Sequence, residues 1–212
     1  IESIVGILNG TTNYILSQMT ETGVSYANAL ADAQKQGFAE ADPTNDVCGF
    51  DAARKLAILS SIGFRANVTF DDVLVEGIEK IDKSDIQYAK EMGYTIKLLT
   101  VALRQEDGIA LNVYPAFLPD NHPLSSVKGS YNAIYVTGNI VDDVMFYGRG
   151  AGALPTASAV MGDVISTAQH ILNGSTGTGM IMTDTKRIPF YSSLKLQNSY
   201  YFRLDVDDVT GV

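Results

Sequence analysis

The stretch YTIKLLTVALRQEDGIALNVYPAFL, Tyr94 to Leu118, decides the fold of this chain. It consists of two apolar runs with strand-like composition, separated by the turn residues Glu106 to Gly108, and this pattern predicts an antiparallel hairpin. A second hairpin is predicted in NAIYVTGNIVDDVMFYG, with its turn at Gly138 and Asn139. Helical segments precede and follow the hairpins. We therefore expect an α+β domain with a mixed, largely antiparallel sheet covered by helices.

Lys97 stands within the first apolar run. Lysine in a strand is typical of sheet edges, where its ammonium stays in water. The sequence therefore predicts a solvated Lys97, with a charge at an interface as the alternative.

Helix signals flank the predicted sheet. Ser25 is a suitable N-cap for a helix that Gly37 ends, and another helix is expected at about Asp85 to Met92. Near the start of the chain, Thr11 or Thr12 can cap the helix NYILSQM. The free N–H groups of such a helix start favour an anion, such as a substrate carboxylate, although water could satisfy them equally.

The segment GFAEADPTNDVCGFDAARKLAILSSIGF, Gly37 to Phe64, carries the clearest candidate site. From Val47 onward it is expected to be one helix, apolar nearly all round, in which Asp51 and Lys55 lie four residues apart. Buried charges must be paired or must change their pKa, so Lys55 is a candidate proton donor. The alternative is an ordinary surface pair.

Acidic residues lead into this helix. Pro43 favours an extended Asp42, which places Glu40 and Asp42 on a loop, and Asp46 falls where an N-cap or first-turn acid belongs. Three acids before a helix that hides a lysine indicate a site.

Composition excludes several classes of function. The 212 residues are 46% hydrophobic and 18% charged, which is typical of a globular protein, and the net charge of -9 argues against nucleic acid or an anionic membrane surface as partner. Cys48 has no second cysteine to pair with, and we expect it to be structural rather than reactive. His122 and His170 are isolated, so no metal site is predicted. With no signal peptide or long apolar run, we expect a cytoplasmic protein.

A glycine-rich turn follows the second hairpin. Gly148, Gly150 and Ala153 fit the pattern G-x-G-x-x-G/A, but no strand ending in an acid follows about 20 residues later. This segment therefore does not make a dinucleotide-binding domain by itself.

Three stretches together resemble homoserine dehydrogenases, enzymes that interconvert aspartate semialdehyde and homoserine with NAD or NADP. They are GILNGTTNYIL, the catalytic-type run GFAEADPTNDVCGFDAARKLAIL, and GRGAGALPTASAVMGDVI. The resemblance implies catalytic roles for Glu40, Asp51 and Lys55. It also implies substrate binding by Gly10, Thr11, Phe38, Glu40, Asp46 and Lys55, and cofactor contacts at Gly148, Gly150 and Gly152.

The resemblance also implies a domain organisation. Residues 1–147 would form a catalytic substrate-binding and dimerisation domain, and residues 148–172 would return to a nucleotide-binding domain outside this chain. Residues 173–197 would be a linker, and residues 198–212 resemble the start of an amino-acid-binding ACT domain. A fragment so defined would bind little cofactor alone, would be inactive, and would associate as a homodimer or higher homo-oligomer.

The expected function is therefore that of homoserine dehydrogenase in threonine, methionine and isoleucine biosynthesis. Two alternatives are a related amino-acid dehydrogenase with another substrate and a non-catalytic dimerisation scaffold.

Overall fold

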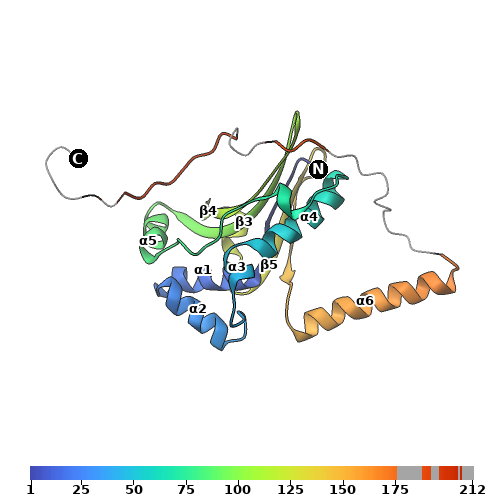
Figure 1. The fold of residues 1–212 in the computed structure, drawn as a ribbon, viewed down its shortest axis with the longest axis horizontal. Helices are drawn as coiled ribbons and strands as arrows, with labels where there is room; N and C mark the ends of the chain where they lie inside the picture. The colour runs from blue at the N-terminus through green and yellow to red at the C-terminus, as the bar shows by residue number, and fades with distance from the viewer. Residues whose placement is uncertain (176–187, 192–195, 205, 207–212) are drawn as a thin grey trace.

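The computed structural model describes residues 1–175, 188–191, 196–204 and 206 (Figure 1). Its elements, in chain order, are β1 (Ser3–Ile7), α1 (Gly10–Thr22), α2 (Tyr26–Lys35), α3 (Thr44–Val47), α4 (Phe50–Phe64), η1 (Phe70–Asp72), β2 (Leu74–Val75), α5 (Lys83–Glu91), β3 (Tyr94–Gln105), β4 (Gly108–Pro119), η2 (Pro123–Ser126), β5 (Tyr131–Gly138), β6 (Asp142–Arg149) and α6 (Ala153–Leu172).

The strands form one six-stranded sheet in the order β2-β4-β3-β1-β5-β6. All neighbouring pairs are antiparallel except the two-residue pair of β2 with β4. The mixed, largely antiparallel sheet predicted from the sequence is confirmed. Both hairpins are present, although residues 139–141 form the second turn and Gly138 still belongs to β5.

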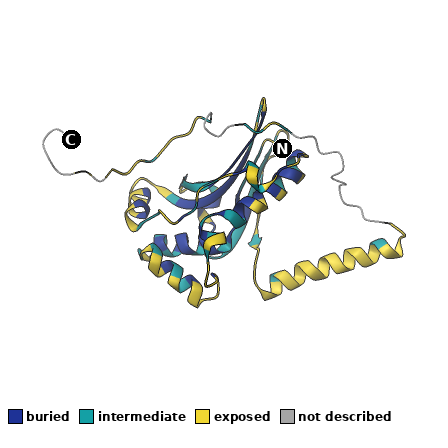
Figure 2. Cartoon of the chain, viewed as in Figure 1, coloured by how far each residue is buried: buried dark blue, intermediate teal, exposed yellow. Residues whose placement is uncertain are grey.

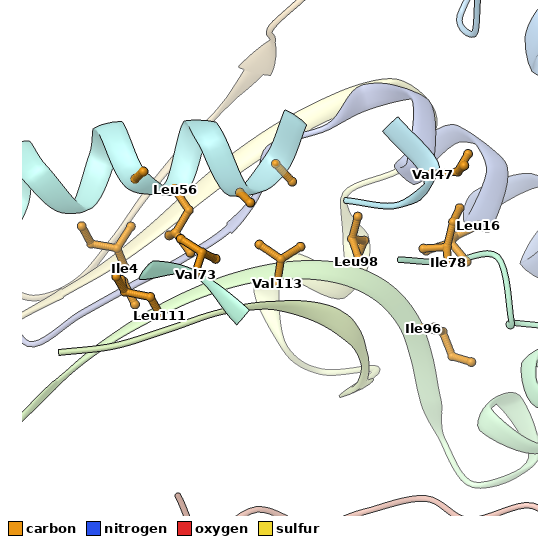
Figure 3. Packing of buried hydrophobic residues seen from close by; sticks show 14 of the residues in the cluster. Ile4, Leu16, Val47, Leu56, Val73, Ile78, Ile96, Leu98, Leu111 and Val113 are labelled. Atoms are coloured by element: carbon orange, nitrogen blue, oxygen red, sulfur yellow. The ribbon is translucent and has the colours of Figure 1, made fainter. Parts of the chain in front are cut away.

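Helices α1 to α5 contribute to one continuous hydrophobic core over a face of the sheet. Figure 3 shows Leu56 of α4 pointing towards Ile4, Val73 and Leu111. A smaller cluster, which includes Leu99 and Val101 of β3, occupies the other face. The alternation of β3 residues between the clusters follows from the two-residue period of a strand.

The helix boundaries partly follow the prediction. Ser25 caps α2, where its side chain accepts a hydrogen bond from Asn28 N, and Gly37 follows the helix with a left-handed φ of 78°. Helix α5 begins two residues earlier than expected, because Asp82 is its N-cap and forms a reciprocal capping box with Asp85.

Two predicted features are wrong. The helix expected from Val47 is interrupted: α3 ends at Val47, and α4 begins after Gly49, whose φ of 81° is costly for a residue with a side chain. The cap of α1 is neither Thr11 nor Thr12 but Asn9, whose side-chain oxygen accepts from Thr12 N at 2.8 Å.

Helix α6 extends away from the sheet and has no buried residue (Figures 1 and 2). Among the described residues no helix combines the length and apolarity needed to cross a membrane.

The predicted linker and the predicted start of an ACT domain lie partly outside the described residues. The parts that are described run beside β4 and α5: Phe190 forms a parallel bridge with Ile109, the Tyr201 ring stacks on Phe117, and Arg203 pairs with Asp85 at 2.9 Å. Residues 198–204 contain no strand. The ACT domain stays a prediction.

Candidate active site

Asn9 organises the candidate site from the junction of β1 and α1. Its amide nitrogen donates to Asp46 Oδ1 at 2.7 Å and to Asp51 Oδ2 at 2.8 Å. Its amide oxygen accepts from the backbone N–H of Thr12. Both amide hydrogens and the oxygen therefore have partners, which fixes the orientation of the amide. We name Asn9, Asp46, Asp51 and Lys55 the Asn9 cluster.

The break at Gly49 places the two acids of the cluster. Asp46 lies in the first turn of α3, whereas Asp51 lies in the first turn of α4. An acid in the first turn is stabilised by the positive end of the helix dipole. Because the chain changes direction between them, both carboxylates reach the same asparagine.

Lys55 joins the cluster to an open cleft. Its ammonium forms an ion pair with Asp51 at 2.7 Å and donates to the backbone oxygen of Leu8 at 3.1 Å. These contacts use two of its three N–H donors. The cleft has a volume of about 430 Å³, and Lys55, Asn132, Gly148 and Gly150 are among its lining residues.

The burial predicted for this pair is wrong. The side chains of Lys55 and Asp51 are 47% and 31% exposed. Ile58 and Ile62, on the same side of α4, are 61% and 49% exposed. An exposed pair of this type contributes little to stability, so the geometry of its contacts, and not a desolvated charge, makes Lys55 a candidate proton donor.

Thr11, in the first turn of α1, contacts Phe38 of the loop after α2. The Thr11 hydroxyl donates to the backbone oxygen of Phe38 at 2.6 Å, and the Tyr14 and Phe38 rings are 4.6 Å apart. The Tyr14 hydroxyl donates to Asp32 at 2.6 Å, and this hydrogen bond raises the pKa of Tyr14. These contacts hold the loop that carries Glu40.

Glu40 lies exposed on this loop, as predicted. Its backbone oxygen accepts from Gln34 at 3.0 Å. Within the described part of the chain, no hydrogen bond ties its carboxylate to the Asn9 cluster. The carboxylate is therefore available to a ligand.

Gly10 and Gly150 lie so close to neighbouring residues that neither leaves room for a side chain. A Cβ added to Gly10 would lie 2.9 Å from Ser130 O, and one added to Gly150 would lie 2.2 Å from Asn132 Nδ2. Gly148 is different, because a Cβ there would have no neighbour within 4 Å. Gly152 is the N-cap of α6 and is not among the residues that line the cleft.

Cys48 lies outside the Asn9 cluster and contacts Glu79 instead. The hydrogen bond from Cys48 to Glu79, with burial as the second cause, raises the pKa of Cys48 to about 11. A protonated thiol is a poor nucleophile, in agreement with the predicted structural role. Among the described residues there is no group of three or more His, Cys, Asp or Glu side chains that could hold a metal ion.

Asn9 and Asn132 are the site residues that the sequence reasoning missed. Asn9 carried a usable signal, since asparagine is a preferred N-cap, but two threonines follow it closely. Asn132 had none, because its place in the cleft depends on how β5 meets the segment after β6.

The fold and the Asn9 cluster define a class of protein: an α+β domain with paired acids and a lysine beside an open cleft. Residues 1–165 match the family model of homoserine dehydrogenase. The chain belongs to the homoserine dehydrogenase family.

Similar proteins agree with this assignment. The homoserine dehydrogenase of Corynebacterium glutamicum is 45% identical over 217 residues, covering 100% of this chain and 48% of that protein. A crystal structure of a homoserine dehydrogenase from Thiobacillus denitrificans matches 90% of this chain and 45% of its own, with a TM-score of 0.85 and 40% identity. A hyperthermophilic archaeal homoserine dehydrogenase mutant, in complex with NADPH, matches 80% of this chain and 48% of its own, with a TM-score of 0.66 and 27% identity. The chain spans about half the length of the curated relatives it matches.

Proposed function

We propose that this chain carries the substrate-binding and proton-transfer site of an NAD(P)-dependent homoserine dehydrogenase, which interconverts L-homoserine and L-aspartate 4-semialdehyde. One observation carries the proposal: the Lys55 ammonium, held by Asp51 and Leu8 O, borders the cleft that Gly148 and Gly150 also line. Membership of the family supports it.

Lys55 is the proton donor in the direction of aldehyde reduction. As hydride reaches the aldehyde carbon, negative charge develops on the oxygen, and a positioned ammonium can stabilise or protonate it. Lys55 has an N–H beyond those given to Asp51 and Leu8. Asp51 holds the ammonium in place through the ion pair, and Asn9 holds Asp51 through a hydrogen bond.

The substrate amino acid is recognised by acids on one side and backbone on the other. Glu40 is exposed, and Asp46 accepts from the Asn9 amide through Oδ1 alone, so both carboxylates can also accept from a substrate ammonium. Gly10 and Thr11 at the start of α1 offer backbone N–H groups to the substrate carboxylate. Phe38 borders the same loop.

Gly148 and Gly150 would border a nicotinamide in this cleft. The space beside Gly148, which a side chain would fill, lets a ring approach the backbone, and Gly150 and Gly152 continue the same segment. When bound, NAD or NADP supplies or accepts the hydride.

The rest of the organisation belongs to the same proposal. The only parallel strand pair among the described residues is β2 with β4, so the nucleotide would be held by polypeptide outside this chain, which residues 148–172 would join. Residues 1–147 would also form a homodimer, and residues 198–212 would begin an ACT domain. The enzyme would act in the cytoplasm, in threonine, methionine and isoleucine biosynthesis.

A substrate panel on the intact dehydrogenase tests the proposal. We expect kcat/KM for L-homoserine to exceed that for L-serine and L-threonine by about 100-fold. Both competitors carry the hydroxyl one carbon nearer to the ammonium, and one missing methylene is worth about 10- to 200-fold. A preference for another amino acid would assign the chain to a related dehydrogenase. If the protein oxidises none of these amino acids, the result would favour the alternative of a non-catalytic dimerisation scaffold.

A further inference from the structure

A group of buried polar contacts joins α1, β3 and residues 127–131 near Gly10. We call it the polar junction. Residues 127–131 lead into β5, and the Asn13 side chain of α1 binds three of their backbone oxygens. Its nitrogen lies 3.1 Å from Val127 O, 2.9 Å from Gly129 O and 3.1 Å from Tyr131 O. The Gly129 N–H donates to Ser17 Oγ of the same helix at 3.2 Å.

Lys97 completes this junction from the sheet. Its ammonium donates to Asn13 Oδ1 at 2.9 Å and to Val127 O at 2.5 Å. The residue is only 2% exposed. No ion pair of the described residues includes it, because the nearby Glu21 and Lys128 pair with each other at 3.1 Å.

Stability alone does not explain a lysine here. Burying an ammonium without a carboxylate is costly, and an apolar residue of similar volume is often neutral or stabilising at such a place. What the ammonium adds is a set of N–H donors directed at converging oxygens. A charged donor makes stronger hydrogen bonds than a neutral one, and it fixes the positions of its acceptors.

Residues 127–131, which Lys97 holds, adjoin the candidate active site at two places: at Gly10 and at the cleft that Lys55 lines. Ser130 O lies against Gly10, where an added Cβ would be 2.9 Å away. Asn132, the residue after the junction, lines the cleft together with Lys55. A shift of residues 127–131 would therefore move the wall beside Gly10 and the wall of the cleft together.

We propose that Lys97 is a positioning residue: with Asn13 it fixes residues 127–131, so that Ser130 packs against Gly10 and Asn132 keeps its place in the cleft. This inference rests on the proposed function, which makes Gly10 part of the substrate pocket. Lys97 itself touches no substrate.

Lys97→Met in the intact dehydrogenase tests the inference. Methionine fills similar volume without donors, so we expect KM for homoserine to rise about 10-fold or more, with a smaller change in kcat. The matched control is Lys128→Met, which removes an exposed lysine from the same junction. We expect its KM to stay within about 2-fold of the wild-type value, since exposed ion pairs contribute little. An unchanged KM in Lys97→Met would overturn the positioning role.

Amide hydrogen exchange gives a readout that does not depend on activity. Exchange at Gly129 and Tyr131 should become at least about 10-fold faster in Lys97→Met and remain unchanged in Lys128→Met. Asn13→Ala removes the side-chain hydrogen bonds to residues 127–131 and should also accelerate exchange at these amides. It replaces Lys97→Met as the test if that variant does not fold. Unchanged exchange in both folded variants would overturn the inference. If the wild-type protein does not oxidise homoserine, the proposed function fails, and the exchange data still decide whether Lys97 holds the junction.

Discussion

Lys55 on α4 is an exposed lysine beside the cleft, whereas Lys97 on β3 is buried among backbone oxygens. Lys55 stands in a helix that is apolar nearly all round, yet its side chain is 47% exposed. Lys97 stands in a strand that suggested a solvated edge, yet it is 2% exposed in a central strand. The difference lies in what covers each residue. Residues 127–131 and α1 cover Lys97, whereas no described element covers Ile58 and Ile62 beside Lys55.

The two lysines therefore suit different tasks. The exposed one can meet a ligand while its ion pair with Asp51 holds it in place. The buried one reaches no ligand and can only hold protein groups. Four predictions test this division.

The largest effect is expected at Lys55. Lys55→Ala in the intact dehydrogenase should lower kcat about 100-fold or more, on the scale of losing a general acid, and should leave stability nearly unchanged because the residue is exposed. Steady-state kinetics and thermal unfolding measure the two effects. The control is Arg54→Ala, which alters the adjacent exposed cation, bonded to Asn45 at 3.1 Å. A near-normal kcat in Lys55→Ala would show that Asp51 and Lys55 form an ordinary surface ion pair with no catalytic role.

The second effect concerns the tie made by Asn9. Asn9→Ser keeps an N-cap oxygen but cannot reach two carboxylates, so kcat/KM should fall by about 10- to 100-fold, the range for hydrogen bonds to charged groups. Stability should fall by about 1 to 3 kcal/mol, because the amide hydrogen bonds to the two carboxylates are weakened although the cap remains. Asn9→Ala, which also loses the cap, should be less stable than Asn9→Ser in chemical denaturation. If kcat/KM is the same in Asn9→Ser and the wild type, the Asn9 contacts with Asp46 and Asp51 do not contribute to the reaction.

The third effect is a pH dependence at Lys97. Burial lowers the pKa of Lys97 to about 8, with Glu21 opposing the shift and Lys128 adding to it. The unfolded chain keeps a higher pKa, so between pH 8 and 10 the unfolded state binds more protons, and stability rises with pH in that window. Relative to Lys97→Met, the wild type should gain on the order of 2 kcal/mol from pH 8 to 10. Denaturant titrations of both proteins measure this difference, which cancels the titration of tyrosines and Cys48.

If the difference in unfolding free energy between wild type and Lys97→Met does not change from pH 8 to 10, Lys97 titrates with an ordinary pKa. Below pH 8 the lysine is protonated in both states. The difference should therefore be constant there.

The smallest effect is expected on the exposed side of α4. Ile58→Gln should change the stability of this chain by less than about 0.5 kcal/mol, as is usual for exposed positions. Its matched control is Leu56→Ala, two residues away and fully buried, which should cost about 2 to 5 kcal/mol. Urea unfolding of both variants measures the contrast. A large loss in Ile58→Gln would show that something covers this side of α4 in solution.

Local sequence signals were sufficient for much of the fold. The strands of both hairpins, the Ser25 cap and the four-residue spacing of Asp51 and Lys55 depend on contacts within a few residues. The loop position of Glu40 followed from Pro43 in the same way. These predictions held because turn chemistry and helix geometry act over short distances.

The sequence by itself thus determined the α+β class, the two hairpins, the helix that carries Asp51 and Lys55, and the residues that resemble the family's site. Only the tertiary structure decided that Asn9 binds both Asp46 and Asp51, which lie 37 and 42 residues further along the sequence. It also decided that Lys55 is exposed while Lys97 is buried. The physical reason is that burial and long-range hydrogen bonds depend on which segments cover one another, and residues 84 apart, such as Lys97 and Asn13, leave no periodic trace of their contact.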